Sequence, residues 1–459
     1  MLLGAGLLAR RRALGALRWP LVAAAAAALA AGLLTAAPAA TLAGAYGRYE
    51  SLPMRLAYLG LLVGAAWLGE RRRTVAAFLL GCGLASIEAL YQAATHALPR
   101  ADGNLGNANL LGALLAMALL LAIDRALGAE APARRAWLGL AALLAAGLAA
   151  STSRSAWLGA VAGLGVLVAF RVRPGRLWLT AAAGLAAVAA AAALIALTPL
   201  RALNDDTGEA RLGVWHDAVA VIAERPVLGW GEDAMGLVFG RHQTGDWGPG
   251  HNFDRAHSMP LDLAATQGVL GLAACTALLG VWWWRVWRRR DAPGAPGFAA
   301  AAAAYLAWSL VNFDWAPATA AFWLLLGAGW PGEPRVPAWR PWRAVAAAVA
   351  VVAGLALAVP AQVADVLYYL GMADRATTLD PLQPTYWAAR GDLASLRRAA
   401  ELGDPNPSTY VALGDAEARA GNEAAARAAY RQALERYPYD ATARQRLADA
   451  TESRTAASG

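Results

Sequence analysis

Apolar residues occur along the chain in runs of about 20, separated by short polar or charged segments. We identify eleven such runs, which start near Trp19, Leu52, Thr74, Asn107, Ala136, Ala156, Leu177, Ala264, Pro296, Ala316 and Ala344. A helix of about 20 apolar residues crosses the hydrocarbon core of a bilayer and satisfies its own backbone hydrogen-bonding groups there. The pattern therefore predicts an all-α, polytopic membrane protein with about 11 transmembrane helices.

Arginine clusters occupy every second connection between the apolar runs. They lie at residues 10–12, 71–73, 125–135, 171–176, 285–290 and 335–343, whereas the other short loops hold isolated arginines such as Arg48, Arg100 and Arg154. Because Lys and Arg accumulate in cytoplasmic loops, we expect the clusters and the N-terminus in the cytoplasm. The alternate loops and the C-terminus are then expected on the outer side.

The first apolar run has a second interpretation. A basic segment at 10–18, an alanine-rich core and the small residues at 37–39 also resemble a signal peptide with its cleavage site. Cleavage would leave residue 41 outside and the next span still running inward. Both interpretations therefore predict the same topology for the rest of the chain.

Two polar segments divide the chain into expected regions. Residues 1–198 and 257–360 hold transmembrane helices, 199–256 form a large outer loop, and 361–459 form a helical tail. Within the loop, Leu212, Trp215, Val219 and Ile222 recur at helical spacing before Pro226. This spacing predicts an amphipathic helix near the membrane surface, with Arg211 in its first turn.

The tail carries the pattern of a tetratricopeptide repeat, a helix pair with interlocking large and small residues. The matching positions are Tyr410, Leu413, Gly414, Ala426, Tyr430, Ala433 and Pro438. We predict one full repeat and one or two degenerate ones. Since about three repeats are needed for independent stability, the tail is expected to lean on the membrane region. It is either a module that binds a protein partner or a plain helical cap.

Composition excludes an ordinary soluble enzyme. Apolar residues make up 58% of the chain and charged residues only 16%, against about 25% charged in soluble domains.

All 40 basic residues are arginine and the net charge is +8. Most arginines lie between apolar runs, so membrane topology explains them and no nucleic-acid partner is expected. Cys82 and Cys275 lie inside apolar runs, which excludes a disulfide framework and a thiolate metal site.

Four segments place polar side chains at the outer edge of the membrane region. They contribute Asn107 and Asn109, Arg154, Arg211 with Trp215, and Arg255 with His257. Each has a structural explanation: the amides cap helices, an arginine snorkels to headgroups or is solvated, and the histidine is buried and satisfied. However, the topology brings all four segments to one face, and ionisable residues at such positions are functional candidates.

These residue types together suit one kind of chemistry. A neutral histidine accepts a proton from a hydroxyl. Two arginines hold a pyrophosphate by paired hydrogen bonds and neutralise its charge as it leaves. The set therefore suits transfer from a lipid pyrophosphate donor.

Seven short motifs occur in order between about residues 103 and 330. They are GNAN at 106–109, SRSAW at 153–157, RLGVW at 211–215, ERPVLGWG at 224–231, DRAH at 254–257, GVLG at 268–271 and VNFD at 311–314. In this order and spacing they resemble the O-antigen ligase and O-antigen polymerase superfamily of bacterial membrane glycosyltransferases. One position differs, since family members usually have Asn after the key histidine and this chain has Ser258.

The resemblance implies a periplasm-facing enzyme of the inner membrane. Arg154 and Arg211 would bind the pyrophosphate of an undecaprenyl-linked glycan, and His257 would activate the acceptor in a metal-independent, inverting transfer without a cofactor. Further substrate contacts are expected from Arg255, Asn107, Asn109 and Trp215. The acceptor stays open between a lipid A core sugar, a growing glycan chain and a protein hydroxyl.

Other interpretations remain. Asp205 and Asp206 resemble the acidic metal site of nucleotide-sugar glycosyltransferases, but those enzymes use a cytoplasmic donor and this pair is expected outside, where it caps the loop helix. The spacing of His242, His251 and His257 fits no standard zinc motif, so we expect no metal site. A transporter of lipid-linked sugars would place polar groups near the bilayer midplane, where Glu88 is the main exception to an apolar interior. A non-catalytic assembly factor would use the tail as its binding module.

Overall fold

The computed structural model describes residues 14–68, 71–172, 176–197, 209–248, 253–331 and 341–458, and every regular element in these ranges is a helix. The long helices are α2 (Arg18–Leu33), α4 (Leu52–Leu68), α5 (Arg71–Thr95), α6 (Ala108–Gly128), α7 (Ala131–Ala150), α8 (Arg154–Arg171), α9 (Leu177–Leu197), α12 (Met259–Arg288), α13 (Ala295–Ser309), α14 (Ala316–Gly329) and α15 (Pro341–Tyr369). Each of the eleven apolar runs falls on one of them, so the all-α prediction is confirmed.

Several of these helices are long and apolar enough to cross a membrane. Among the described residues there are six: Gly15–Leu33, Arg71–Thr95, Ala108–Gly128, Ala131–Ala150, Arg154–Arg171 and Met259–Arg288. Three shorter apolar helices, Leu52–Trp67, Ala181–Ile195 and Ala316–Gly329, accompany them. The fold is that of a multi-pass membrane protein, and the count of 11 spans stays a prediction.

Helix α6 lies at the centre of the helical body, where 72% of its apolar window is buried. It packs against α7, α8 and α13. Close approach of α8 to α13 depends on Gly159 and Gly163, because a Cβ at either position would lie 2.6 Å from a backbone oxygen of α13. Small residues at such crossings let membrane helices pack tightly.

Helix α12 is broken where the outer loop crosses it. Gly268 has φ +65 inside this helix, and the next amide, of Val269, donates to the Pro226 oxygen at 2.7 Å. A Cβ at Gly268 would lie 2.2 Å from the Val227 carbonyl carbon, and one at Gly229 would lie 2.5 Å from that of Thr266. The glycines of two sequence motifs therefore permit one backbone crossing, which fixes the loop onto the span.

The predicted loop helix is present as α10 (Glu209–Glu224), followed by α11 (Met235–Val238) and η4 (Phe239–His242). Its buried side consists of Val214, Ala218 and Val221, which pack into a small core of the loop. Leu212 and Val219, from the apolar stripe expected in the sequence, are exposed. The helix thus has two apolar sides, and the exposed one suits a membrane surface.

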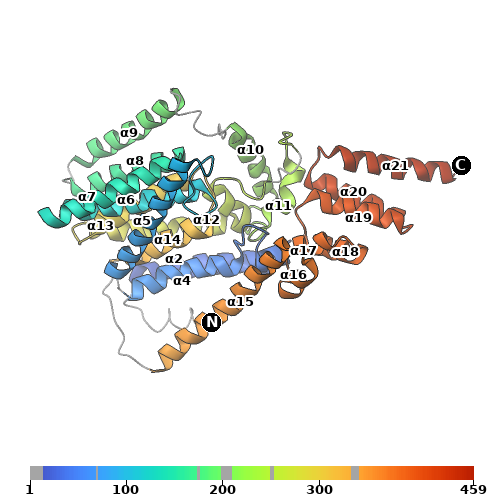
Figure 1. Ribbon diagram of the computed structural model, residues 1–459, viewed down its shortest axis with the longest axis horizontal. Helices are drawn as coiled ribbons and strands as arrows, with labels where there is room; N and C mark the ends of the chain where they lie inside the picture. Colours follow the sequence, from blue (N-terminus) through green and yellow to red (C-terminus); the bar gives the residue numbers. More distant parts are fainter. Residues whose placement is uncertain are drawn as a thin grey trace.

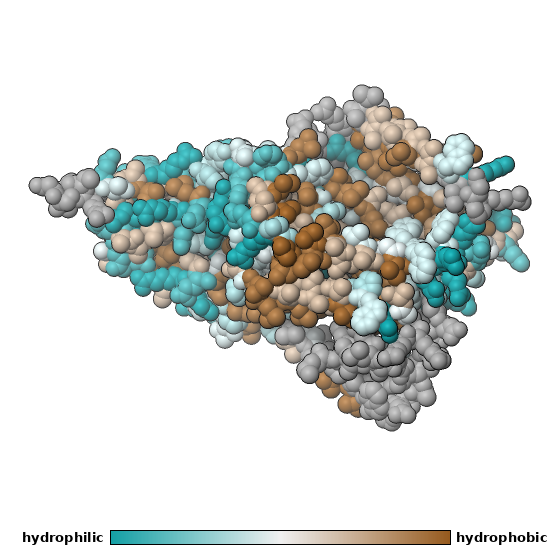
Figure 2. Space-filling view, turned by 180° about the vertical axis from the view of Figure 1, so that it is seen from behind, coloured by the Kyte–Doolittle hydropathy of each residue, from teal (hydrophilic) through white to brown (hydrophobic). Residues whose placement is uncertain are grey.

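The tail consists of short helices beside the helical body (Figure 1). They are α16 (Ala373–Leu379), α17 (Pro384–Arg390), α18 (Leu393–Leu402), α19 (Pro407–Arg419), α20 (Glu423–Arg436) and α21 (Ala441–Ser458). A Cβ at Gly414 would lie 2.3 Å from the Tyr430 ring, which is the expected interlock of α19 with α20. Figure 2 shows mainly hydrophilic residues on the tail and hydrophobic residues gathered on the body.

The tail was expected to lean on the membrane region, and the structure shows it packed against the outer loop. Arg436 donates to the Leu237 oxygen at 2.8 Å, and the Tyr437 hydroxyl donates to Asp246 at 2.6 Å. This bond lowers the pKa of the Asp246 carboxyl. The tail was expected to begin at residue 361. That residue falls within α15, which continues to Tyr369.

Gly240→Ala should loosen this docking. A Cβ at Gly240 would lie 2.1 Å from the Arg436 oxygen, and an overpacked contact costs about 1–3 kcal/mol. We expect limited proteolysis to release the tail faster than in the wild type. Gly236→Ala is the matched control, because its Cβ would meet its nearest atom at an ordinary 3.4 Å; equal cleavage of both variants would contradict the docking contact.

Candidate functional site

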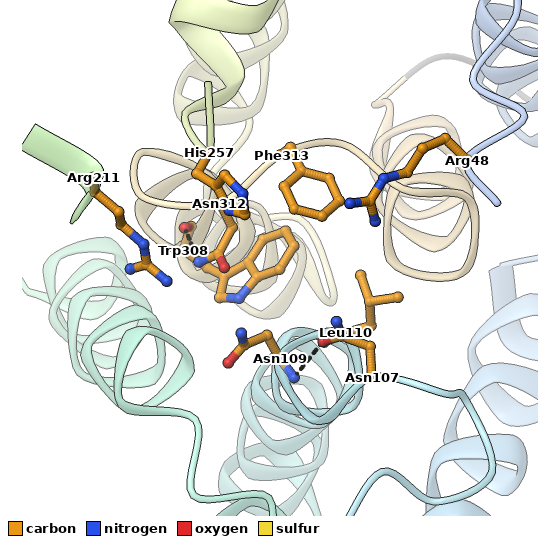
Figure 3. Close-up of a pocket in the computed structure, with 9 residues that line it drawn as sticks. All are labelled: Arg48, Asn107, Asn109, Leu110, Arg211, His257, Trp308, Asn312 and Phe313. Atoms are coloured by element: carbon orange, nitrogen blue, oxygen red, sulfur yellow. Dashed lines mark hydrogen bonds between the residues drawn. The ribbon is translucent and has the colours of Figure 1, made fainter. Parts of the chain in front are cut away.

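A pocket of about 160 Å³ opens where several helix ends meet (Figure 3). It is lined by Arg48, Asn107, Asn109, Leu110, Arg211, His257, Trp308, Asn312 and Phe313. These residues come from the loop before α4, the N-terminal ends of α6, α10 and α12, and the C-terminal end of α13 with the turn after it. Three of the four segments singled out in the sequence therefore contribute to one cavity.

The two asparagines hold the start of α6. The Asn107 Oδ1 accepts from the amides of Asn109 and Leu110 at 2.8 and 3.3 Å, as in a helix N-cap. The Asn109 Oδ1 accepts from Arg100 at 3.0 Å and from the Ser153 hydroxyl at 2.9 Å. Both residues thus have a structural role and also line the pocket.

His257 stands in an uncommon backbone conformation, with φ +52. Such a conformation costs on the order of 1–3 kcal/mol and persists only where its surroundings enforce it. Here the next residues are fixed, because the Met259 amide donates to the Asn312 oxygen at 2.9 Å. The imidazole contacts Phe313 edge to face, with ring centroids 4.9 Å apart. The ring is therefore held at the pocket wall.

Asn312 connects three helices at the pocket. Its side-chain nitrogen donates to the Ser155 hydroxyl at 3.1 Å and to the Trp308 oxygen at 2.9 Å, while its backbone oxygen receives the Met259 amide. It joins the starts of α8 and α12 to the end of α13, and only 4% of it is exposed.

The two arginines expected to bind pyrophosphate take different positions. Arg211, in the first turn of α10, lines the pocket. Arg154 opens α8 outside the lining, but its neighbours Ser153 and Ser155 bond the pocket residues Asn109 and Asn312. Arg154 therefore lies between two serines that each hydrogen-bond to a side chain of the pocket wall.

Arg255 and Trp215 do not line the pocket. The Arg255 guanidinium is buried and forms an ion pair with Asp233. Asp233 also accepts from the amides of Ala45 and Glu50, at 2.8 and 2.9 Å. Through Asp233, Arg255 anchors the loop before α4. A substrate contact of Arg255 or of Trp215 stays a prediction.

Several functional candidates escaped the sequence analysis. Arg48, Trp308 and Phe313 line the pocket but were not assigned a role from the sequence. The isolated position of Arg48 in an outer loop and the place of Phe313 in the VNFD motif were the available signals. A buried ionic cluster was also missed: Arg55 lies between Glu232 at 3.4 Å and Asp314 at 2.8 Å. Charged residues at the ends of apolar runs are the available signal for such clusters.

Glu50 belongs to the same cluster, two residues after Arg48. Its carboxylate accepts from the Tyr58 hydroxyl at 2.6 Å. Burial raises the pKa of Glu50 to about 7, against the opposing influence of Arg55 and Arg255. The cluster ties the loop before α4 to α4, the outer loop and the turn after α13.

Comparison with known proteins bears on the same region. Residues 139–276 match the O-antigen ligase family. Residues 407–450 match a tetratricopeptide repeat, and no curated protein matches the chain. The resemblance predicted from the sequence, including the tail, is confirmed. The matched stretch contains Arg154, Arg211 and His257, and it supports a membrane glycosyltransferase-like function.

The metal-site alternatives find no support in the described residues, where no group of three His, Cys, Asp or Glu side chains is placed to hold an ion. His242 pairs instead with Glu224 at 2.9 Å. Asp205, Asp206 and His251 lie outside the described residues. That the reaction is independent of metal stays a prediction.

Proposed function

We propose that this protein transfers a glycan from undecaprenyl pyrophosphate to an acceptor hydroxyl, at a site that faces the periplasm. The observation that carries the proposal is the shared pocket of His257 and Arg211, within a stretch that matches the O-antigen ligase family. A base and a cation in one pocket are what this transfer needs.

In the proposed step the acceptor oxygen attacks the anomeric carbon of the donor sugar. The bond from that carbon to the pyrophosphate oxygen breaks, and its electron pair leaves with the pyrophosphate. The neutral His257 ring takes the hydroxyl proton as a general base. A single direct displacement inverts the anomeric configuration and uses no metal or cofactor.

The arginines act on the leaving group, which gains one negative charge as the bond breaks. Arg211 and Arg154 stabilise this charge more in the transition state than in the bound substrate, and such differential binding accelerates the reaction. Arginine suits the task because its planar fork forms two hydrogen bonds to a phosphate. Asn107 and Asn109 also line the pocket and offer amide groups there.

A membrane enzyme suits this donor because its polyprenyl chain stays in the bilayer. The exposed Leu212 and Val219 of α10 support a position of this helix, which carries Arg211, at the lipid surface. The alternation of arginine clusters supports a periplasmic position of this side, and the match to the O-antigen ligase family supports the inner membrane.

The docked tail favours a protein or polymer acceptor over a lipid A core sugar. Helical repeats form concave surfaces that bind extended partners, and α20 packs against the same outer loop that carries Arg211. Glycan profiles of a deletion strain distinguish the acceptors: lost ligation with intact polymer, altered polymer length, or lost glycoprotein.

The direct test is transfer in vitro with purified protein, undecaprenyl-pyrophosphate glycan and candidate acceptors, in the presence of a chelator. Chelator-resistant product is expected. If no acceptor yields product while lipid-linked glycan crosses proteoliposome membranes, the protein is a transporter and the proposal fails.

Arg211→Lys should lower kcat/KM by about 10- to 100-fold, the equivalent of one charged hydrogen bond of about 1.5–3 kcal/mol. Lysine keeps the charge but loses the planar fork. Arg225→Lys is the matched control, because Arg225 follows the same helix and stacks on Trp230 at 4.2 Å, outside the pocket lining. Equal activity of Arg211→Lys and the wild type would show that Arg211 does not act through two hydrogen bonds to the phosphate.

A further inference from the structure

We propose that Arg48 is a further substrate-binding residue, which holds the diphosphate of the lipid-linked donor together with Arg211. The inference rests on the proposed function. Arg48 lies outside the stretch that matches the family, yet it lines the same pocket. Figure 3 shows Arg48 and Arg211 reaching toward the pocket from opposite sides, with His257 and Phe313 between them.

The guanidinium of Arg48 is held by aromatic rings and one carboxylate. It lies 4.5 Å from the Phe313 ring centroid and 5.0 Å from that of Trp315. Its Nε and Nη2 donate to the two Asp254 oxygens at 2.6 and 3.3 Å. These bonds use two of the five N–H donors of an arginine, which leaves three for an anion.

The loop that carries Arg48 is braced by the outer loop and by the tail. Asp233 accepts from the amides of Ala45 and Glu50. From the tail side, Gln383 donates to the Gly44 oxygen at 3.4 Å, and the hydroxyls of Tyr49 and Tyr386 lie 3.4 Å apart. The position of Arg48 is therefore set before any ligand binds, which lowers the entropic cost of binding.

Arg48 is a cation that favours an anionic ligand, and its partner Asp254 opposes one. Arg48 and Asp254 are both partly exposed, at 24% and 28% of their side chains, so the pair is accessible from solvent. Asp254 neutralises Arg48 while the pocket is empty and also repels a diphosphate. Removing this carboxylate should strengthen diphosphate binding, whereas removing Arg48 should weaken it.

The experiment measures binding of undecaprenyl pyrophosphate, the leaving group, to the purified full chain in nanodiscs. We expect about 10-fold weaker binding for Arg48→Ala, an intermediate loss for Arg48→Lys, and tighter binding for Asp254→Asn. Arg241→Ala is the matched control: Arg241 also lies over a ring, Trp230, and pairs with a carboxylate, Glu224, but outside the pocket lining. It should bind as the wild type does.

The double variant Arg48→Ala with Asp254→Asn separates binding from bracing. If the double variant binds undecaprenyl pyrophosphate as weakly as Arg48→Ala does, Arg48 contacts the diphosphate directly. If Arg48→Ala and Asp254→Asn reduce transfer equally but leave binding unchanged, Arg48 only braces the His257 segment and the inference is overturned. If Arg211→Ala weakens binding and Arg48→Ala does not, the role of Arg48 is rejected and the proposed function stands. If neither variant weakens binding, the proposed function is rejected as well.

Discussion

His257→Ala should lower the rate of glycan transfer by at least about 10²-fold, the lower end of what a general base contributes. Without the imidazole, the acceptor hydroxyl loses the base that we propose at the wall where His257 contacts Phe313. Donor binding should persist, because the arginines remain. The measurement is the transfer assay, with undecaprenyl pyrophosphate binding determined on the same preparation.

The backbone at His257 needs its own control, because φ is +52 there and alanine tolerates that region poorly. His257→Asn keeps a residue that adopts this conformation readily and still removes the base. His96→Ala is the matched control for the backbone, since His96 is exposed with φ +51 and lies outside the pocket lining. Wild-type transfer in His257→Asn would exclude His257 as the base.

The helical fold was predictable because its signals are local. Each apolar run is long enough to define a helix by itself, and the repeat in the tail depends on a spacing within about 30 residues. The meeting of Asn107, Arg211 and His257 also followed from topology, since alternate helix ends share one side of the membrane. Predicting the helices, the repeat and the shared face did not require knowing which helix packs against which.

The ionic partners were not predictable because they join distant segments. Arg48 pairs with Asp254 across about 200 residues, and Arg55 pairs with Asp314 across more than 250. No sequence period connects such positions. The same reason explains Arg255: a lone arginine at a membrane edge looks available, and only the fold reveals that Asp233 already neutralises it.

Gly268→Ala should destabilise the protein by more than about 3 kcal/mol, from overpacking and backbone strain together. The new Cβ would lie 2.2 Å from both the carbonyl carbon and oxygen of Val227, and φ is +65. These neighbours are backbone atoms that hydrogen-bond to α12 itself, so they cannot move aside without breaking the crossing. We expect a lower midpoint of thermal unfolding in detergent and less folded protein in membranes.

The crossing also positions the site, so its loss should reach the chemistry. The crossing ties the segment that follows α10 to α12. Helix α10 carries Arg211, and α12 begins just after His257. Any Gly268→Ala protein that does fold should therefore show reduced transfer. Gly280→Ala is the control in the same helix, because its Cβ would meet nothing within 4 Å and alanine is favoured over glycine in helices by about 1 kcal/mol. Equal stability and activity of Gly268→Ala and Gly280→Ala would mean that the loop does not depend on this crossing for its place above the pocket.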